Sequence, residues 1–242
     1  MTQPKLVRSS FAGMSAVDVF TTVAGFTKDA ESFLVEWYVA PPDVTERVAD
    51  RPQLRSAIQD ATAEPARLHF WDTFLYHAAE RGIASEDVIA FSEYRNIPAS
   101  APVRLSRRDI LANRLRHLAE QELHSRLNLL SKVRLRSGGT AHVAMLDFVG
   151  SVSDETPRLL LAIAKRLLPE GGFLLRSDRS FHLLGRTLVS SRRRSRLHAD
   201  SLFYCPLVDR MYLAHQMRRG VSSLRVSPST PCGRPPYVVA AF

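Results

Sequence analysis

The feature that most constrains the fold of this chain is a change of pattern at Val133. From Val133 to Arg136, apolar and basic residues alternate, which is typical of a strand with one buried face. Residues 137–140, Ser-Gly-Gly-Thr, then predict a hairpin turn, and the mostly apolar run His142–Phe148 predicts the returning strand. The second half of the chain is therefore expected to be built on a β-sheet.

Helices and further strands follow this hairpin. Thr156 and Pro157 predict the start of a helix over Leu159–Leu168, and Gly171–Gly172 predict its end. The later elements are expected as strands over 172–177, 181–189 and 222–227, helices over 190–203 and 212–219, and an edge strand over 235–240. Strands interleaved with helices and hairpins indicate the α+β class, with a mixed β-sheet core flanked by helices.

The first 130 residues have a different pattern, in which apolar residues recur at helical spacing. Helices are predicted over 28–40, 66–81 and 106–131, the last with Ser106 as its N-cap. Two domains follow from this change of pattern: a mainly helical N-terminal region over residues 1–130, and an α+β core over residues 131–242.

Charge divides the chain in a similar way. Residues 1–100 carry nine basic and 14 acidic side chains, whereas residues 101–242 carry 24 basic and ten acidic ones. A positive C-terminal part favours a polyanionic partner, although a general bias toward arginine would also produce such an excess, because only four of the 33 basic residues are lysine.

Composition restricts the remaining classes of protein. The longest apolar run, Leu159–Ala164, is too short to span a membrane, and the first five residues lack the apolar segment of a secretory signal. Cys205 and Cys232 lie in no zinc-binding or disulfide pattern. A cytoplasmic protein without a membrane partner is expected.

Three polar residues stand where strands of the predicted core end. Asp147 closes an apolar run and is expected to face a cleft, a cation or a helix N-terminus, unless it only caps the following loop. His182 follows a polar turn, where it and Arg179 are able to donate hydrogen bonds to one phosphate; a purely structural histidine is the alternative. Asp209 precedes a helix, and its alternative role is that of an N-cap.

These residues occur in three motifs, Met145-Leu146-Asp147-Phe148, Ser177-x-Arg179-x-x-His182-x-x-Gly185 and Leu207-Val208-Asp209. Their order and spacing resemble the archaeo-eukaryotic primase superfamily, and most closely the bacterial primase 1D-like proteins, over residues 133–239. The resemblance implies that Asp147 and Asp209 are catalytic and bind Mg²⁺ or Mn²⁺ in a two-metal site. It also implies that His182, with Ser177 and Arg179 beside it, contacts a nucleoside triphosphate.

One departure from the pattern bears on activity. The superfamily usually has a second acid two residues after the first, and that position is Val149 here. Two carboxylates remain where three are expected, which reduces the negative charge available to hold two metal ions. Asp178 replaces a small residue and would repel a triphosphate if it pointed inward. A weakened or inactive relative that still binds nucleotide or nucleic acid is thus an alternative.

An arginine-rich segment follows the second motif. The arginines of this segment are Arg192, Arg193, Arg194 and Arg196. They are expected either to bind a nucleic-acid backbone or to form a solvated helix face.

Three hypotheses follow for the function. The chain is a template-dependent primase-like nucleotidyltransferase; or a catalytically inactive binding subunit of a larger assembly, such as a bacterial anti-phage defence system; or an interaction subunit. In the last hypothesis the acidic N-terminal region docks a protein partner. The first two require nucleic acid and nucleoside triphosphates as partners.

Overall fold

The computed structural model describes the chain in segments that together form two compact units. The described residues are 10–39, 48, 50–63, 70–93, 101–121, 125–149, 156–178, 180–228 and 233–242. The larger unit consists of residues 1–38 and 98–242, and the smaller unit of residues 39–97. The chain enters the larger unit first, leaves it for the smaller unit, and then returns. The boundaries between the two units therefore follow residues 38 and 97 in the sequence, and not residue 130.

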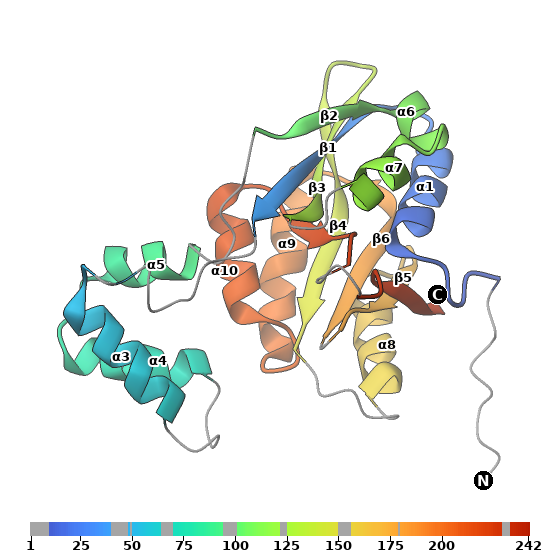
Figure 1. The fold of residues 1–242 in the computed structure, drawn as a ribbon. Coiled ribbons are helices and arrows are strands. Elements are labelled where there is room, and N and C mark those ends of the chain that lie inside the picture. Colours follow the sequence, from blue (N-terminus) through green and yellow to red (C-terminus); the bar gives the residue numbers. More distant parts are fainter. Residues whose placement is uncertain are drawn as a thin grey trace, which may run out of the picture. The chain divides into compact units, whose positions relative to one another are not determined.

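The larger unit is built on an eight-stranded sheet (Figure 1). Seven strands follow the order β2-β1-β3-β4-β6-β5-β8, and β7 pairs with the first part of β3. The strands are β1 (Ala30–Val39), β2 (Val103–Ser106), β3 (Ser125–Leu135), β4 (Thr140–Phe148), β5 (Gly172–Arg176), β6 (Phe181–Val189), β7 (Ser223–Arg225) and β8 (Tyr237–Ala241). Helices pack on both faces, so the predicted α+β class, a sheet core flanked by helices, is confirmed.

The helices divide between the two faces of the sheet. One core contains residues of α1 (Ala16–Phe26), α6 (Arg107–Leu111) and α7 (Arg114–Gln121). The other core contains residues of α8 (Thr156–Leu167), α9 (Ser191–Ser201) and α10 (Arg210–Arg219), and a short 3₁₀ helix, Leu202–Tyr204, follows α9.

Strand β4 lies between these two cores. Val143 and Met145 belong to the first core, and Ala144, Leu146 and Phe148 to the second. A strand buried on both faces must be apolar at successive positions, which explains the continuous apolar run in the sequence.

The helix predicted over residues 28–40 is wrong, because this segment is strand β1. Phe33 and Val35 are fully buried in the first core, with Ala30 at the start of the strand. In register, Phe33 pairs with Leu105 and Val35 with Val103 of β2. Apolar residues on both faces gave the segment a spacing that also fits a helix, and the tertiary pairing decides between the two.

The helix predicted over 106–131 is right at its start and wrong at its end. Ser106 caps α6 in a capping box with Asp109. Asn113, with φ of 63°, then breaks the helix, and α7 ends at Gln121. The start of β3 is instead held by β7 and the residues after it: the Leu127 carbonyl accepts from the Val226 amide at 2.9 Å, and the Leu127 amide donates to Ser227 Oγ at 2.9 Å.

The elements predicted after residue 133 are confirmed with small shifts of their ends. The β3–β4 hairpin, α8, β5, β6, α9, α10, β7 and the edge strand β8 all occur where the sequence indicates them. Gly220 ends α10 in the left-handed region at φ 67°, where a side chain at Cβ would be strained.

The smaller unit is helical within its described residues. It contains α3 (Pro52–Ala63), α4 (Phe70–Glu80), which lies within the predicted helix 66–81, and α5 (Ser85–Glu93). Trp71, Phe74 and Phe91 form its aromatic core, with ring centroids 5.0–6.0 Å apart. Arg51 and Asp87 form an ion pair at 2.8 Å. Among the described segments, no helix is long and apolar enough to span a membrane.

Candidate active site at the end of β4

The ends of β4 and β6 bring two of the predicted site residues together. Asp147 and His182 stand opposite each other in the antiparallel register of these strands. Their closest atoms, Asp147 Oδ1 and His182 Nε2, are 3.7 Å apart, which is too long for a hydrogen bond. The hydroxyl of Ser180 approaches the same carboxylate oxygen at 3.4 Å. The imidazole is buried, whereas the carboxyl group keeps about a quarter of its surface exposed.

Asp209 joins this pair through the backbone. Its amide donates to the carbonyl of Asp147 at 3.0 Å, next to a bridge between Phe148 and Val208. The Asp209 carboxylate accepts from the Tyr212 amide at 2.9 Å and so caps α10. The N-cap role predicted as an alternative is therefore present, and the same geometry places Asp209 beside Asp147.

The environment keeps both members of the Asp147–His182 pair neutral. Burial, with the charge of Asp209 added, raises the pKa of Asp147 to about 8. Burial, with the charge of Arg225 added, lowers the pKa of His182 to about 3. At neutral pH the contact is thus between a protonated carboxyl and an uncharged imidazole, and it is not an ion pair. A cation bound between the two carboxylates would reverse the first effect.

A mostly buried arginine lies beside the site. Arg225 of β7 donates from Nη2 to Ser177 Oγ at 2.5 Å and to Asp178 Oδ2 at 3.1 Å, and from Nη1 to the Ser227 carbonyl at 2.9 Å. Burial lowers the pKa of Arg225, and Asp147 acts in the opposite direction. Asp178 is therefore ion-paired with Arg225, and its repulsion of a triphosphate stays a prediction. Ser177 is buried and engaged by the same guanidinium.

Two more side chains lie in this region, one near Arg225 and one near Asp147. Arg126, at the start of β3, adds positive charge beside Arg225, and its Nε is buried without a hydrogen-bond partner within the described residues. Burial raises the pKa of Tyr212 well above its usual value, and Asp147 adds to that effect. Arg126 and Tyr212 were not predicted as site residues, and Arg225 was not assigned a role. An arginine between the core residues Leu224 and Val226 was the available signal for Arg225.

Arg179 lies outside the described residues, so its predicted phosphate contact has no geometry here.

The four arginines predicted as a nucleic-acid-binding face do not share one face. Arg194 is 6% exposed, and its Nε and Nη1 have no hydrogen-bond partner among the described residues. Arg193 donates to the Leu167 carbonyl at 2.9 Å, and Arg196 lies 3.7 Å from Asp200. Arg192 is exposed. Arg194 therefore cannot belong to a solvated helix face, because its guanidinium points into the protein.

Arg194 belongs to a buried polar layer between α9 and the sheet. His142 has Ser131 Oγ and Ser191 Oγ each at 3.1 Å from its two ring nitrogens. His198 Nε2 lies 3.1 Å from a serine hydroxyl, that of Ser222. Burial, with Arg194 as the next cause, lowers the pKa of each histidine to about 4. The histidines thus stay neutral beside the buried guanidinium.

Among the described residues, the acidic donors at the site are fewer than two metal ions need. Val149 occupies the position of the second acid and binds the Leu207 carbonyl through its amide at 2.8 Å. Within the described part of the chain, no cluster of three or more acidic, histidine or cysteine residues is suited to hold a metal. Two carboxylates, those of Asp147 and Asp209, are within the number that Mg²⁺ commonly takes from a protein, since it completes its shell with water and phosphate oxygens.

Comparisons with known proteins identify the family of the chain. A family model described as archaeo-eukaryotic primase 1D-like (AEP-like) matches residues 109–234, which is more than half of the chain and includes Asp147, His182, Asp209 and Arg225. Neither the curated proteins nor the solved structures give a match. The match begins in α6 and ends just before β8, so it covers the strands and helices that form the site. The chain belongs to the archaeo-eukaryotic primase 1D-like family.

Proposed function

We propose that this primase-like protein binds a nucleoside triphosphate with a divalent cation at the end of β4 and transfers its nucleotide to the 3′-hydroxyl of a nucleic-acid strand, with pyrophosphate as the leaving group. The observation that carries the proposal is the meeting of Asp147, His182 and Asp209. The strand register places Asp147 opposite His182. The 3.0 Å hydrogen bond from the Asp209 amide to the Asp147 carbonyl holds Asp209 beside Asp147.

Asp147 and Asp209 are the proposed metal ligands. When bound, Mg²⁺ or Mn²⁺ would neutralise the charge of the phosphates and stabilise the negative charge that develops during the transfer. Asp147 has to lose its proton to act as a ligand, and its raised pKa supports this role, because a carboxyl group close to another carboxylate ionises readily only when a cation compensates it.

His182 and the neighbouring arginines are the proposed phosphate contacts. A neutral imidazole donates one N–H to a phosphate oxygen without needing a proton from solvent. Arg225 adds positive charge close to Asp147, and Arg126 adds positive charge close to Arg225. Part of the Arg225 charge is compensated by Asp178. Arg179 is proposed as a further phosphate contact on the resemblance alone.

Calorimetric titration with a nucleoside triphosphate and Mn²⁺ tests the binding. Wild type is expected to bind only with the metal, and Asp147→Ala combined with His182→Ala is expected to abolish binding. Asp200→Ala is a matched control, because it removes an acid on α9 whose ion pair with Arg196 is long and exposed. Binding that is equal in wild type and in the double variant would refute the site. Primer extension with the same variants then tests transfer.

A binding subunit without catalysis is the second candidate, and Val149 favours it. In this form, the site holds a nucleotide or a nucleic-acid end inside a larger assembly, such as an anti-phage defence system. The smaller unit, whose residues 39–97 carry ten acidic and six basic side chains, would dock the partner protein. Metal-dependent nucleotide binding without primer extension, together with a neighbouring helicase or nuclease gene, would support this candidate.

A further inference from the structure

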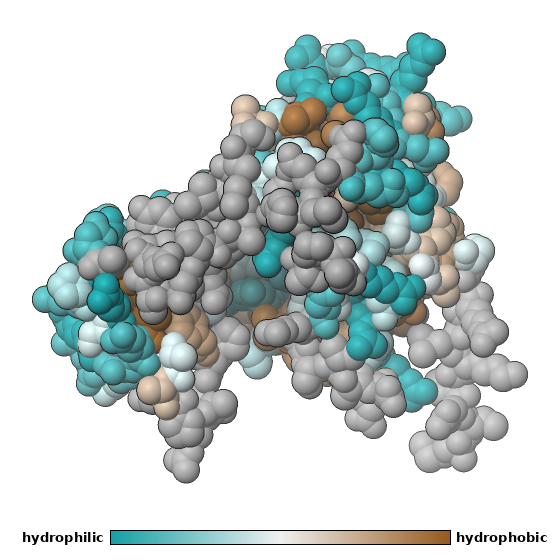
Figure 2. All heavy atoms as spheres, viewed as in Figure 1, coloured by the Kyte–Doolittle hydropathy of each residue, from teal (hydrophilic) through white to brown (hydrophobic). Residues whose placement is uncertain are grey.

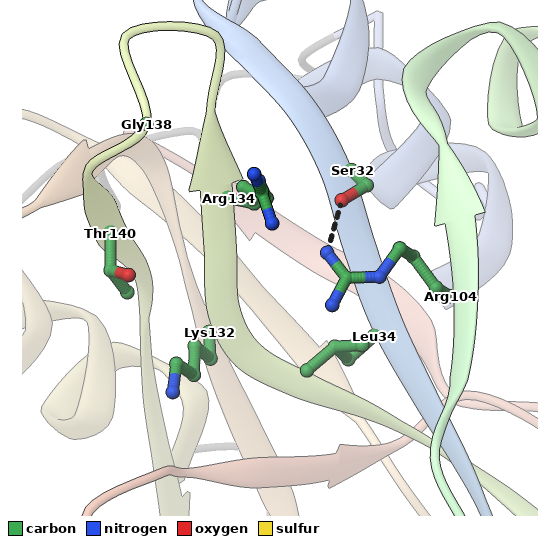
Figure 3. Close-up of a pocket in the computed structure, with 7 residues that line it drawn as sticks. All are labelled: Ser32, Leu34, Arg104, Lys132, Arg134, Gly138 and Thr140. Atoms are coloured by element: carbon green, nitrogen blue, oxygen red, sulfur yellow. Dashed lines mark hydrogen bonds between the residues drawn. The ribbon is translucent and has the colours of Figure 1, made fainter.

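A basic groove lies on the open part of the sheet, away from the site just described. It encloses about 290 Å³ and is lined by residues of four neighbouring strands and the hairpin, namely Ser32, Leu34, Arg104, Lys132, Arg134, Gly138 and Thr140 (Figure 3). The three cations come from two strands, β2 and β3, with Leu34 and Ser32 of β1 between them. This lining combines positive charge, hydroxyl groups and one apolar side chain.

The groove faces the side of the sheet opposite the first core. Phe33, Leu105 and Val133 are buried in that core. Because side chains alternate along a strand, their neighbours Leu34, Arg104 and Lys132 point to the other face. On that face α9 covers β4 as far as His142, which stands opposite Lys132 in the register. The groove therefore begins where the helical cover ends.

The charges of the groove are compensated only in part. Arg134 Nε is paired with Glu31 at 3.0 Å. Arg104 donates to the neutral Ser32 hydroxyl at 3.2 Å (Figure 3). No acidic partner of Arg104 or Lys132 occurs among the residues that the structure describes, and both side chains are exposed. Figure 2 shows the surrounding end of the larger unit, with β2, α6 and the hairpin, as largely hydrophilic with apolar residues between.

The groove is separate from the proposed nucleotide site. Thr140 begins β4 and Asp147 lies near its end, so the two positions are about 23 Å apart along the strand at ~3.3 Å per residue. A substitution in the groove therefore leaves the Asp147 environment unchanged. Of the four arginines of α9, Arg194 is buried and Arg193 and Arg196 are engaged, so only Arg192 is exposed and without a partner among the described residues.

We infer that this groove binds the phosphate backbone of a single nucleic-acid strand, independently of base sequence. The cations stand on β2 and β3, two strand spacings or about 9.6 Å apart, so they present charge at more than one point, which suits a chain of phosphates better than one isolated anion. Arginine donates a planar pair of N–H groups to phosphate oxygens, and Leu34 provides apolar surface for a sugar or base. The inference rests on the proposed function in one respect only, namely that nucleic acid is the partner.

Fluorescence anisotropy with a labelled single strand of about 20 nucleotides, as DNA and as RNA, tests the inference over a salt series. The variant Arg104→Glu with Lys132→Glu is compared with the charge-matched control Lys165→Glu with Arg166→Glu, which changes two exposed residues in the last turn of α8. We expect at least tenfold weaker binding for the groove variant. Because two phosphate contacts are removed, its slope of log affinity against log salt should fall by about 1.4. The control should bind like wild type.

Binding by the groove variant that equals wild type would overturn the inference, as would equal losses in the groove variant and the control. Calorimetry with nucleoside triphosphate and Mn²⁺ on the same proteins separates the two proposals. Nucleotide binding that persists while no strand binds to wild type would overturn the groove alone. Strand binding that depends on Arg104 and Lys132 while no nucleotide binds would support the groove and refute the proposed nucleotide site.

Discussion

The two ends of β4 differ in how far the polar side chains around them are buried and in how their charges are paired. Around Asp147 the polar side chains are half-buried or buried, and compensation is local: Arg225 contacts Ser177 and Asp178, and Asp147 itself is protonated at neutral pH. Around Thr140 the cations are exposed, and two of them have no acidic partner in the described part of the chain. Buried groups act at short range and with fixed geometry, whereas exposed charges act over longer distances and are screened by salt.

The largest effect is expected at the buried end. Asp147→Ala removes a proposed metal ligand, and nucleotide transfer should fall by about 10³-fold, or ~4 kcal/mol of transition-state stabilisation. Primer-extension rates at saturating Mn²⁺ measure this. Asp200→Ala should leave the rate within about twofold, because its side chain lies on the outer part of α9. An Asp147→Ala enzyme with the wild-type rate would remove this end of β4 from the chemistry.

Arg225→Ala should have the next largest effect, and on stability. It leaves Asp178 without its cation and the Ser177 hydroxyl and Ser227 carbonyl without a donor, which should lower the free energy of unfolding by about 2–4 kcal/mol. Urea denaturation measures the change. Arg192→Ala, at an exposed position of α9, should change stability by less than ~0.5 kcal/mol. Equal stability of the two variants would mean that the contacts of Arg225 with its polar neighbours do not contribute to the free energy of unfolding.

Asp147→Asn should reveal the raised pKa through the pH dependence of stability. The folded protein holds this proton up to about pH 8, whereas an unfolded aspartic acid loses it near pH 4, so wild-type stability should fall as pH rises between these values. The asparagine variant has no such proton to lose. Its free energy of unfolding should therefore rise by about 1–2 kcal/mol relative to wild type from pH 5 to pH 9. This figure is reduced because the carboxyl group is partly exposed. Urea midpoints at pH 5, 7 and 9, without divalent metal, measure it. Parallel pH profiles would show that Asp147 is ionised at neutral pH.

The smallest effects are expected within the groove. Single neutral substitutions there distinguish a cation without an acidic partner among the described residues from one that is already ion-paired. Lys132→Gln should weaken single-strand binding by about three- to fivefold, and Arg134→Gln by less than twofold, because Glu31 already compensates Arg134. Anisotropy titrations at one low salt concentration resolve the difference. The reverse order would show that the Glu31 pair opens when a strand binds.

Much of the larger unit could be predicted from the sequence because its signals are local. The β3–β4 hairpin follows from Ser-Gly-Gly-Thr between two strand patterns, and α10 follows from Gly220 at its end. In contrast, β1 was predicted as a helix, because a segment with apolar residues on both faces has no unique period. Only its pairing with β2 and β3, which lie far away in the sequence, makes it a strand.

The site could be predicted in part for a similar reason. Asp147 and Asp209 follow apolar segments directly, and His182 follows a polar turn between two predicted strands, so the positions of all three were visible in the sequence. The inward orientation of the Arg194 side chain could not be predicted, because the sequence does not show which side of the arginine-rich helix packs against the sheet. The same holds for Arg104 and Lys132, which line one groove only because β1 lies between β2 and β3.

The pairing of β1 with β2 also determines how the smaller unit is attached. Val35 and Val103 are register partners, so the chain leaves for residues 39–97 and returns at neighbouring positions on adjacent strands. The smaller unit is thus an insertion into a β-hairpin, in the way that whole domains are inserted into surface loops. Evolution could gain, lose or exchange this unit as one piece without breaking any strand pairing of the sheet, and a relative with a short turn between β1 and β2 would keep both ends of β4 intact.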